Sequence, residues 1–254
     1  DARKITLENI SSYARELSSQ VDAGLKSVSY AQNQLSSVNV VVSTMRGDSK
    51  LSVSPSSLVG ERSHIREVVP LSLDRQTYEL AVSRLESEEA KLALAFAREF
   101  GMRLREAGLF RPKGALTEFI KNGTFNIHQG VKGGRTVDRL IQPSKSQVQL
   151  LVRAQQVLGA RCLVDRVGKY TEWKNKFYRE YENCGAHGAI GKFHDNRAAF
   201  ACEMYQKITG SPAPVVAGSR VISKERDKEA RMQISHMLGH GRIDVIAQYI
   251  GTGK

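Results

Sequence analysis

Apolar residues recur at helical spacing over most of the chain, and this pattern predicts a mainly helical fold. Near the start, one predicted helix face collects Leu7, Ile10, Tyr13, Ala14, Leu17 and Val21. A second apolar run continues to about Met45, so two or three short helices fit this part. The stretch 46–70 is rich in Gly, Ser and Pro, which favour turns. We therefore place a domain boundary between about residues 67 and 74.

Beyond this boundary the apolar spacing predicts a longer series of helices. We expect them at residues 76–90, 91–109, 147–158, 171–182, 196–209, 224–238 and 244–250. Between residues 124 and 141, β-prone segments flank Gly133-Gly134, a pair that supplies the positive φ angles of a tight hairpin turn. The predicted fold class is mainly α with a small antiparallel β-sheet, in two domains at residues 1–70 and 71–254.

The charge of the chain points to a polyanionic partner. The 254 residues include 38 Lys and Arg against 26 Asp and Glu, which gives a net charge of +12. Residues 1–70 contribute only +1 of this, so the excess belongs to the C-terminal part. Nucleic acid is the first candidate for such a partner. Basic charge alone does not separate an enzyme from a binding protein.

Several functional classes lack their usual signatures in this sequence. There is no GxxxxGK[ST], GxGxxG or HExxH motif, and the three cysteines show no CxxC spacing. We therefore expect no cofactor, no metal and no disulfide framework. No apolar stretch is long enough to cross a bilayer and no signal segment opens the chain, which predicts a cytoplasmic protein without a membrane partner. Because the chain begins at Asp1 instead of Met, we expect a processed or trimmed protein.

Five short segments contain the residues that could take part in catalysis or binding. They are Phe100-Gly101-Met102-Arg103 with Glu106, Lys132-Gly133-Gly134-Arg135, His194-Asp195-Asn196-Arg197, Leu238-Gly239-His240, and Tyr249. In order and spacing they resemble the catalytic domain of tyrosine recombinases of the phage-integrase type, and most of all the integrases of bacterial integrating conjugative elements and genomic islands. The resemblance covers roughly residues 75–251. Its most specific parts are the HxxR segment and the Leu-Gly-His segment followed nine residues later by Tyr249. Where the family has His and a small hydroxyl residue after HxxR, this chain has Ala198 and Ala199.

The resemblance implies a nucleophile and two phosphate clamps. Tyr249 would attack a DNA phosphate and form a 3′-phosphotyrosyl link, while Arg103 and Arg197 would grip that phosphate. A phenol has a reference pKa of about 10, so its attack at neutral pH requires cationic neighbours or a base. Glu106 lies one helical turn beyond Arg103 and is expected to support it.

The resemblance also implies roles in proton transfer and DNA contact. Lys132 would protonate the departing 5′ oxygen from a mobile hairpin, and Arg135 would touch DNA beside it. His194 would assist proton transfer, and His240 would donate a hydrogen bond to the phosphate. His194 and Arg197 stand three residues apart, so on a helix they face the same side.

The implied activity is site-specific recombination that integrates or excises a mobile element. The partners would be double-stranded DNA recombination sites, bound by a homotetramer with accessory DNA-bending factors, in a nucleoid-associated setting. Residues 1–70 would be a helical core-binding domain that completes a clamp around DNA. Two alternatives remain: a non-enzymatic helix-turn-helix DNA-binding protein built around His240, and a type IB topoisomerase-like enzyme. An RNA-binding scaffold lacks an aromatic-rich RNP-like segment.

Overall fold

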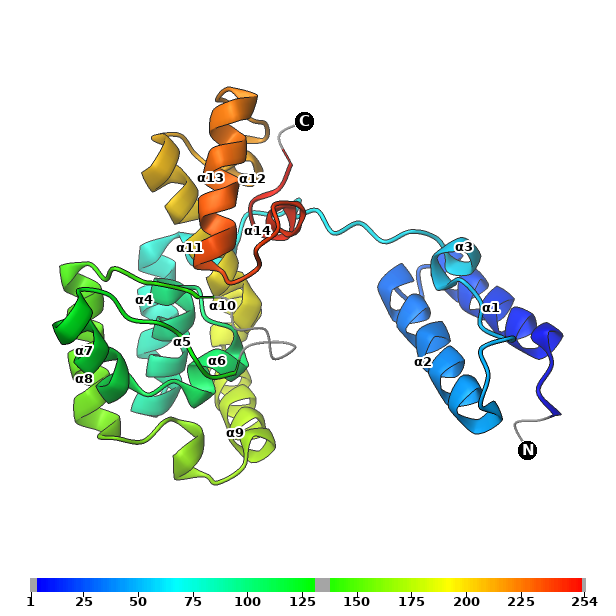
Figure 1. Cartoon of the computed structure of the whole chain (residues 1–254), viewed down its shortest axis with the longest axis horizontal. Coiled ribbons are helices and arrows are strands. Elements are labelled where there is room, and N and C mark those ends of the chain that lie inside the picture. Colours follow the sequence, from blue (N-terminus) through cyan, green and yellow to red (C-terminus); the bar gives the residue numbers. More distant parts are fainter. Residues whose placement is uncertain (1–3, 131–137, 253–254) are drawn as a thin grey trace. The chain divides into compact units, whose positions relative to one another are not determined.

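A computed structural model describes residues 4–130 and 138–252 of the chain (Figure 1). The chain divides into two compact units, residues 1–64 and 65–254. The division falls slightly before the boundary predicted at residue 70. The reason is that Arg66 already bonds within the larger unit, where its backbone N–H donates to the carbonyl of Ala247 at 2.9 Å.

The smaller unit is helical, and its helices match the two or three short ones predicted there. They are α1 (Leu7–Asp22), α2 (Val28–Arg46) and α3 (Pro55–Val59). The side chains of Thr6 and Ser27 cap α1 and α2 by accepting N–H groups of the first turn. A small apolar core that includes Leu17, Leu35 and Val59 joins the three helices.

The larger unit is also built from helices. Its first half contains η2 (Leu71–Leu73), α4 (Arg75–Ser83), α5 (Glu88–Phe100), α6 (Leu104–Leu109), α7 (Pro112–Asn122) and α8 (Lys145–Leu158). Its second half contains η4 (Val164–Arg166), α9 (Tyr170–Asn183), α10 (Ala186–Ile190), α11 (Phe193–Thr209), α12 (Pro214–Ala217), α13 (Lys224–Met237), η5 (Asp244–Ile246) and α14 (Ala247–Ile250). The mainly helical class predicted from the apolar spacing is confirmed.

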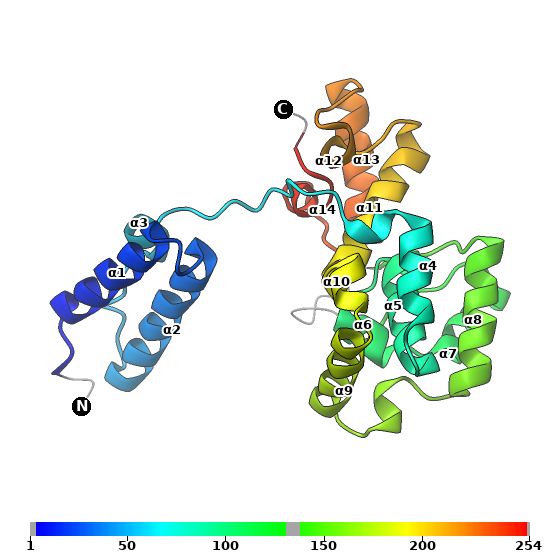
Figure 2. The same cartoon turned by 180° about the vertical axis from the view of Figure 1, so that it is seen from behind.

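Helix α5 lies at the centre of the larger unit, with α8 and α9 on opposite sides of it in Figure 1 and, from behind, in Figure 2. Helix α11 packs on α5 and also on α13 and α14. The buried apolar residues form two clusters, one around α5, α8 and α9 and the other around α11, α13 and α14. Where α5 ends next to α11, polar side chains can therefore lie between two apolar clusters.

The prediction of one helix over residues 91–109 is wrong. Helix α5 ends at Phe100, because Gly101 adopts the left-handed conformation with φ of +61°. A new helix, α6, begins at Leu104 with Arg103 as its N-cap. Arg103 therefore stands at a break between helices and not in the middle of an apolar helix.

The small antiparallel sheet predicted between residues 124 and 141 is not found in the described residues. They contain a single antiparallel bridge, in which Phe125 and Ile141 exchange two backbone hydrogen bonds of 3.0 and 2.8 Å. Next to it, the side-chain oxygen of Asn126 accepts the backbone N–H of Arg139 at 2.8 Å. In a longer antiparallel ladder, the backbone N–H of Arg139 would donate to a carbonyl of the opposite strand. Here it donates to the side chain of Asn126 instead. The predicted turn at Gly133-Gly134 lies outside the described residues.

In the described ranges of both units, none of the helices combines the length and the apolar character that a membrane span requires.

Candidate active site

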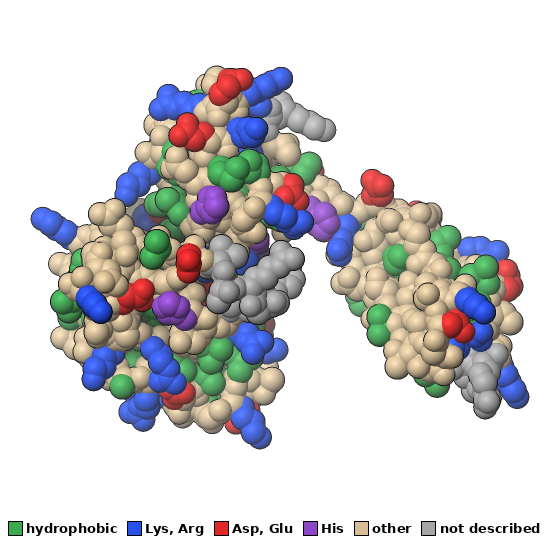
Figure 3. Space-filling model, in the orientation of Figure 1, with side chains coloured by type: hydrophobic (Ala, Val, Ile, Leu, Met, Phe, Trp, Pro, Cys, Tyr) green, Lys and Arg blue, Asp and Glu red, His purple; other side chains and the backbone are tan. Residues whose placement is uncertain are grey.

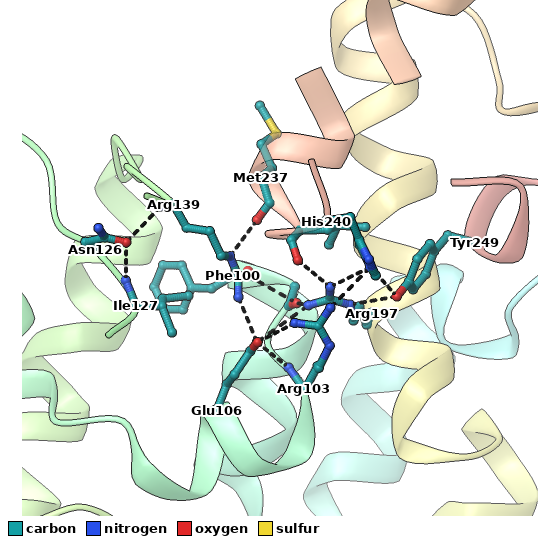
Figure 4. A network of polar contacts seen from close by, with 12 residues as sticks. Phe100, Arg103, Glu106, Asn126, Ile127, Arg139, Arg197, Met237, His240 and Tyr249 are labelled. Atoms are coloured by element: carbon teal, nitrogen blue, oxygen red, sulfur yellow. Dashed lines mark hydrogen bonds and ion pairs between the residues drawn. The ribbon is translucent and has the colours of Figure 1, made fainter. Parts of the chain in front are cut away.

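Four of the predicted catalytic side chains meet between α5, α11 and α14 (Figure 4). Arg103 comes from the N-cap of α6, Arg197 from α11, His240 from the turn after α13, and Tyr249 from α14. These residues are far apart in the sequence, yet hydrogen bonds connect all four. The fold thus creates one polar cluster from four separate elements.

The phenol of Tyr249 is enclosed and held by two partners. Only 2% of the residue is exposed. Its hydroxyl oxygen lies 2.8 Å from Nε2 of His240 and accepts the Nε–H of Arg197 at 3.2 Å. The Arg197 guanidinium also lies near the face of the ring, 5.4 Å from the centroid. The Arg197 guanidinium thus contacts Tyr249 both at the hydroxyl oxygen and over the ring.

The contacts around His240 determine which ring nitrogen carries the proton. Besides the phenol, its Nε2 faces Nη2 of Arg197 at 3.2 Å and Nη2 of Arg103 at 3.3 Å. Guanidinium nitrogens can only donate hydrogen bonds. We therefore assign Nε2 as the unprotonated acceptor, and the Tyr249 hydroxyl donates its proton towards it. In this arrangement Nε2 of His240 is not a donor, although the resemblance implies that His240 donates a hydrogen bond to a phosphate.

The electrostatic surroundings agree with a neutral His240. Burial of the ring lowers the pKa of His240 to about 3, and the positive charges of Arg197 and Arg103 contribute to the lowering. The imidazole is therefore uncharged at neutral pH and has a lone pair to offer the phenol. An anion bound among the same arginines would reverse part of this effect and make the ring more basic.

Arg197 is completely buried and held by backbone carbonyls. Its Nη2 donates to the carbonyl of Leu238 at 2.6 Å, and its Nη1 donates to the carbonyl of Gly101. Burial lowers the pKa of Arg197 to about 10, so the guanidinium stays charged at neutral pH. Because both carbonyls fix the plane of the guanidinium, the Nε–H has a defined direction, towards Tyr249.

Glu106 supplies the negative charge at the base of the cluster. It is fully buried, and its carboxylate accepts the backbone N–H of Arg103 at 2.8 Å and a guanidinium N–H of the same residue at 2.5 Å. Burial alone raises the pKa of a carboxyl group, but nearby positive charges outweigh it and lower the pKa of Glu106 to about 2. These charges belong to Arg139, Arg197 and Arg103.

Arg103 is the more open of the two predicted phosphate clamps. Its side chain is 22% exposed, whereas the Arg197 side chain is wholly enclosed. Glu106 holds one end of the Arg103 guanidinium, and the remainder lies beside His240. An incoming anion would therefore meet Arg103 first.

A further buried arginine, Arg139, was not predicted from the sequence. It is 1% exposed and donates to Glu106 at 2.7 Å, to the carbonyl of Phe100 at 3.1 Å and to the carbonyl of Met237 at 2.9 Å. It thus ties the end of α5 to the end of α13 beneath the cluster. The only signal was a lone basic residue in a β-prone stretch, which is too weak to indicate burial.

Two glycines allow the elements to approach this closely. A Cβ atom at Gly101 would lie 2.6 Å from the ring of Phe200, and one at Gly239 would lie 2.6 Å from Cδ of Arg139. Both glycines also have φ angles above +60°. A larger residue at either position would strain the backbone and push apart the elements that carry Arg197 and His240.

The remaining predicted residues lie at the edge of the cluster or outside the described part. His194 is exposed on the first turn of α11, and its ring centroid is 5.2 Å from that of Tyr249. Lys132 and Arg135 lie outside the described residues. Ala198 and Ala199, where the sequence departs from the recombinase pattern, are fully buried on α11, which packs on α5.

Comparisons with known proteins add no assignment: no family model, no curated protein and no solved structure matches this chain.

Proposed function

We propose that this chain is a site-specific DNA strand transferase of the tyrosine recombinase type, with Tyr249 as the nucleophile. The observation that carries the proposal is the hydrogen bonding of the Tyr249 hydroxyl to His240 and Arg197, inside a cluster that also contains Arg103. A tyrosine with only a packing role needs one partner for its hydroxyl. Here the phenol has a proton acceptor on one side and a fixed cation on the other.

The proposed reaction follows from these contacts. The Tyr249 oxygen forms a bond to the phosphorus, its proton passes to Nε2 of His240, and the bond between phosphorus and the 5′ oxygen breaks. The departing oxygen takes a proton from a general acid, the role that the resemblance gives to Lys132. A free 5′ hydroxyl later attacks the 3′-phosphotyrosyl link and releases the tyrosine. One phosphodiester is exchanged for another, so no nucleotide hydrolysis is required.

The arginines would stabilise the charge that develops on the phosphate. Arg103 and Arg197 both lie next to the His240–Tyr249 pair, so a phosphate placed there could receive hydrogen bonds from two guanidiniums. Glu106 and Arg139 would keep those groups oriented before the substrate binds. Such preorganisation costs no rearrangement at the moment of reaction.

Net charge supports double-stranded DNA as the partner. Residues 71–254 carry +11 of the overall +12, and Figure 3 shows basic side chains over much of the larger unit. In our proposal four copies act on two DNA sites, as the resemblance implies. Phosphate neutralisation by these side chains would supply most of the affinity.

The helix-turn-helix alternative receives less support from the same segment. Helix α14 has four residues, and its Tyr249 and Ile250 are buried. A recognition helix must present several exposed side chains to a groove. The topoisomerase-like alternative shares the proposed nucleophile, and it predicts relaxation of supercoiled DNA without strand exchange.

A nicked suicide substrate tests the proposal. DNA with a nick just 3′ of the cleavage point loses the short fragment that carries the new 5′ hydroxyl, so religation fails and the covalent protein–DNA adduct accumulates. We expect the adduct with the wild-type chain and not with Tyr249→Phe, which retains the ring. DNA binding by both proteins without any adduct would favour the non-enzymatic alternative.

A further inference from the structure

One arginine ties the segment at the start of the larger unit to the helix that carries Tyr249. The backbone N–H of Arg66 donates to the carbonyl of Ala247 at 2.9 Å, and its Nε lies 3.4 Å from the carbonyl of Gln248. Ala247 and Gln248 immediately precede Tyr249. Arg66 therefore contacts α14 through both its backbone and its side chain.

The other end of the same guanidinium reaches α11. Its Nη2 lies 2.5 Å from Oδ1 of Asp195, the residue after His194. The second carboxylate oxygen of Asp195 accepts the N-cap N–H of Lys192 at 2.7 Å, which fixes the carboxylate at the first turn of α11. The side chains of Arg66 and Asp195 are 15% and 22% exposed, so water screens this ion pair less than a surface pair.

The packing at the end of α14 supports the same connection. Gly251 follows the helix with φ of +77°, and a Cβ atom there would lie 3.0 Å from the carbonyl oxygen of Arg66. The chain after Tyr249 and the chain around Arg66 are thus in close contact. Arg66 therefore lies between α11 and α14 and contacts both helices.

We infer that Arg66 is a positioning residue for Tyr249: by bridging Asp195 on α11 to the carbonyls of α14, it keeps the phenol aimed at His240 and Arg197. This inference rests on the function proposed above. Arg66 belongs to none of the segments that carry the recombinase resemblance. Displacements of about 1 Å in a reacting group can reduce a rate on the order of 100-fold, so a tie of this kind affects the chemistry without touching the substrate.

The test compares Arg66→Ala with Arg62→Ala in single-turnover cleavage of the nicked substrate. Arg62 is an exposed arginine in the preceding segment, bonded to Ser29 and His64, and serves as the matched control. For Arg66→Ala we expect the cleavage rate at saturating DNA to fall by roughly 10- to 100-fold with an unchanged DNA dissociation constant. Arg62→Ala should retain the wild-type rate. A weakened DNA affinity with an unchanged saturating rate would instead identify Arg66 as a DNA contact and overturn the inference.

A double variant tests whether Arg66 acts through Asp195. If the two residues form one bridge, Arg66→Ala combined with Asp195→Asn should cleave no more slowly than the slower single variant. Multiplied losses would show that the two residues act independently, and this would also overturn the inference.

Hydrogen exchange separates a failure of this inference from a failure of the proposed function. The Gly251 N–H, which donates to Ala247 at 3.1 Å, should exchange faster in Arg66→Ala, while amides of α8 exchange as in the wild type. Unchanged exchange at residues 247–251 would refute the tie to α14 whatever the activity. A wild-type protein that forms no adduct would refute the proposed function, and the positioning role would fail with it even if exchange became faster.

Discussion

The hydroxyl oxygen of Tyr249 lies 2.8 Å from Nε2 of His240, and the two residues are nine positions apart in the chain. A turn, the short helix η5 and the first turn of α14 bring them together, so their contact is encoded by local spacing. Arg103 and Arg197, in contrast, reach the same histidine from distant segments. The candidate site therefore combines one local pair with two arginines that only the packing of α5 against α11 supplies.

The protonation of His240 can be measured directly. Its folded pKa of about 3 lies below the unfolded value near 6.5, so the unfolded chain binds the extra proton between these pH values. This group therefore contributes stability that is fully present above about pH 6.5 and is lost as the pH falls towards 3. Ring ¹⁵N chemical shifts should show an unprotonated Nε2 at pH 5 in the folded protein and a protonated ring in about 6 M urea. A folded-state midpoint near 6.5 would contradict the assignment.

Removal of the Glu106 charge should destabilise the larger unit strongly. Glu106→Gln would leave the surrounding guanidiniums without their buried counter-ion, at a cost of about 3–5 kcal/mol in unfolding free energy. Urea unfolding followed by the fluorescence of Trp173, the single tryptophan, measures this loss. The control Glu172→Gln removes an exposed partner of Lys169 and should cost no more than about 1 kcal/mol.

Glu106→Gln should also change how the free energy of unfolding depends on pH under acidic conditions. The folded pKa of Glu106 is about 2, below its unfolded value near 4.3, so its contribution is present above about pH 4.3 and is lost as the pH falls to 2. Glu106→Gln should therefore lose less stability than the wild type over this interval. Parallel pH curves for the two proteins would contradict the electrostatic role given to Glu106.

Alanine substitutions at two glycines distinguish the energetic cost of backbone strain from that of close packing. Gly101 and Gly123 both end helices with positive φ, but a Cβ would clash with Phe200 only at Gly101, since Gly123 faces open space. We expect Gly123→Ala to cost about 1–2 kcal/mol for its backbone conformation. Gly101→Ala should cost a further 1–3 kcal/mol or so from overpacking. Equal losses in urea unfolding would show that the approach of α5 to α11 tolerates an added methyl group.

DNA binding should depend steeply on salt. Each phosphate neutralised by Lys or Arg releases counter-ions, so affinity should fall by ~10³-fold or more between about 50 and about 200 mM salt if six or more phosphates are contacted. Fluorescence anisotropy with labelled duplex DNA measures the slope. A flat response would argue against an extended clamp around DNA.

The sequence predicted helices well where capping and apolar spacing agree. Helix α8 was expected at residues 147–158 and begins at Lys145, because Ser144 and Gln147 form a capping box. The single helix expected over 91–109 is wrong because an internal glycine is often tolerated in a helix. The contact that requires Gly101 here, with Phe200 on α11, becomes visible only in the folded chain.

The motif residues of the candidate site could be predicted from the sequence, but the residues that hold them in place could not. Arg103, Arg197, His240 and Tyr249 were proposed from the sequence and lie together. Arg66 was missed because a lone arginine in an irregular segment carries no local pattern, and its partners Asp195 and Gln248 are distant in the chain. Contacts of this kind, made by residues that support the site from outside its motif, depend on tertiary packing. The spacing of apolar residues along the chain does not encode them.

Identification of the residue joined to DNA tests the central claim most directly. The covalent adduct from a nicked substrate is digested with nuclease and protease, and the modified peptide is sequenced by mass spectrometry. Our account predicts a phosphotyrosyl link on Tyr249, no adduct with Tyr249→Phe, and wild-type adduct with Tyr13→Phe in the smaller unit. A DNA link on any other residue, or adduct formation by Tyr249→Phe, would contradict it.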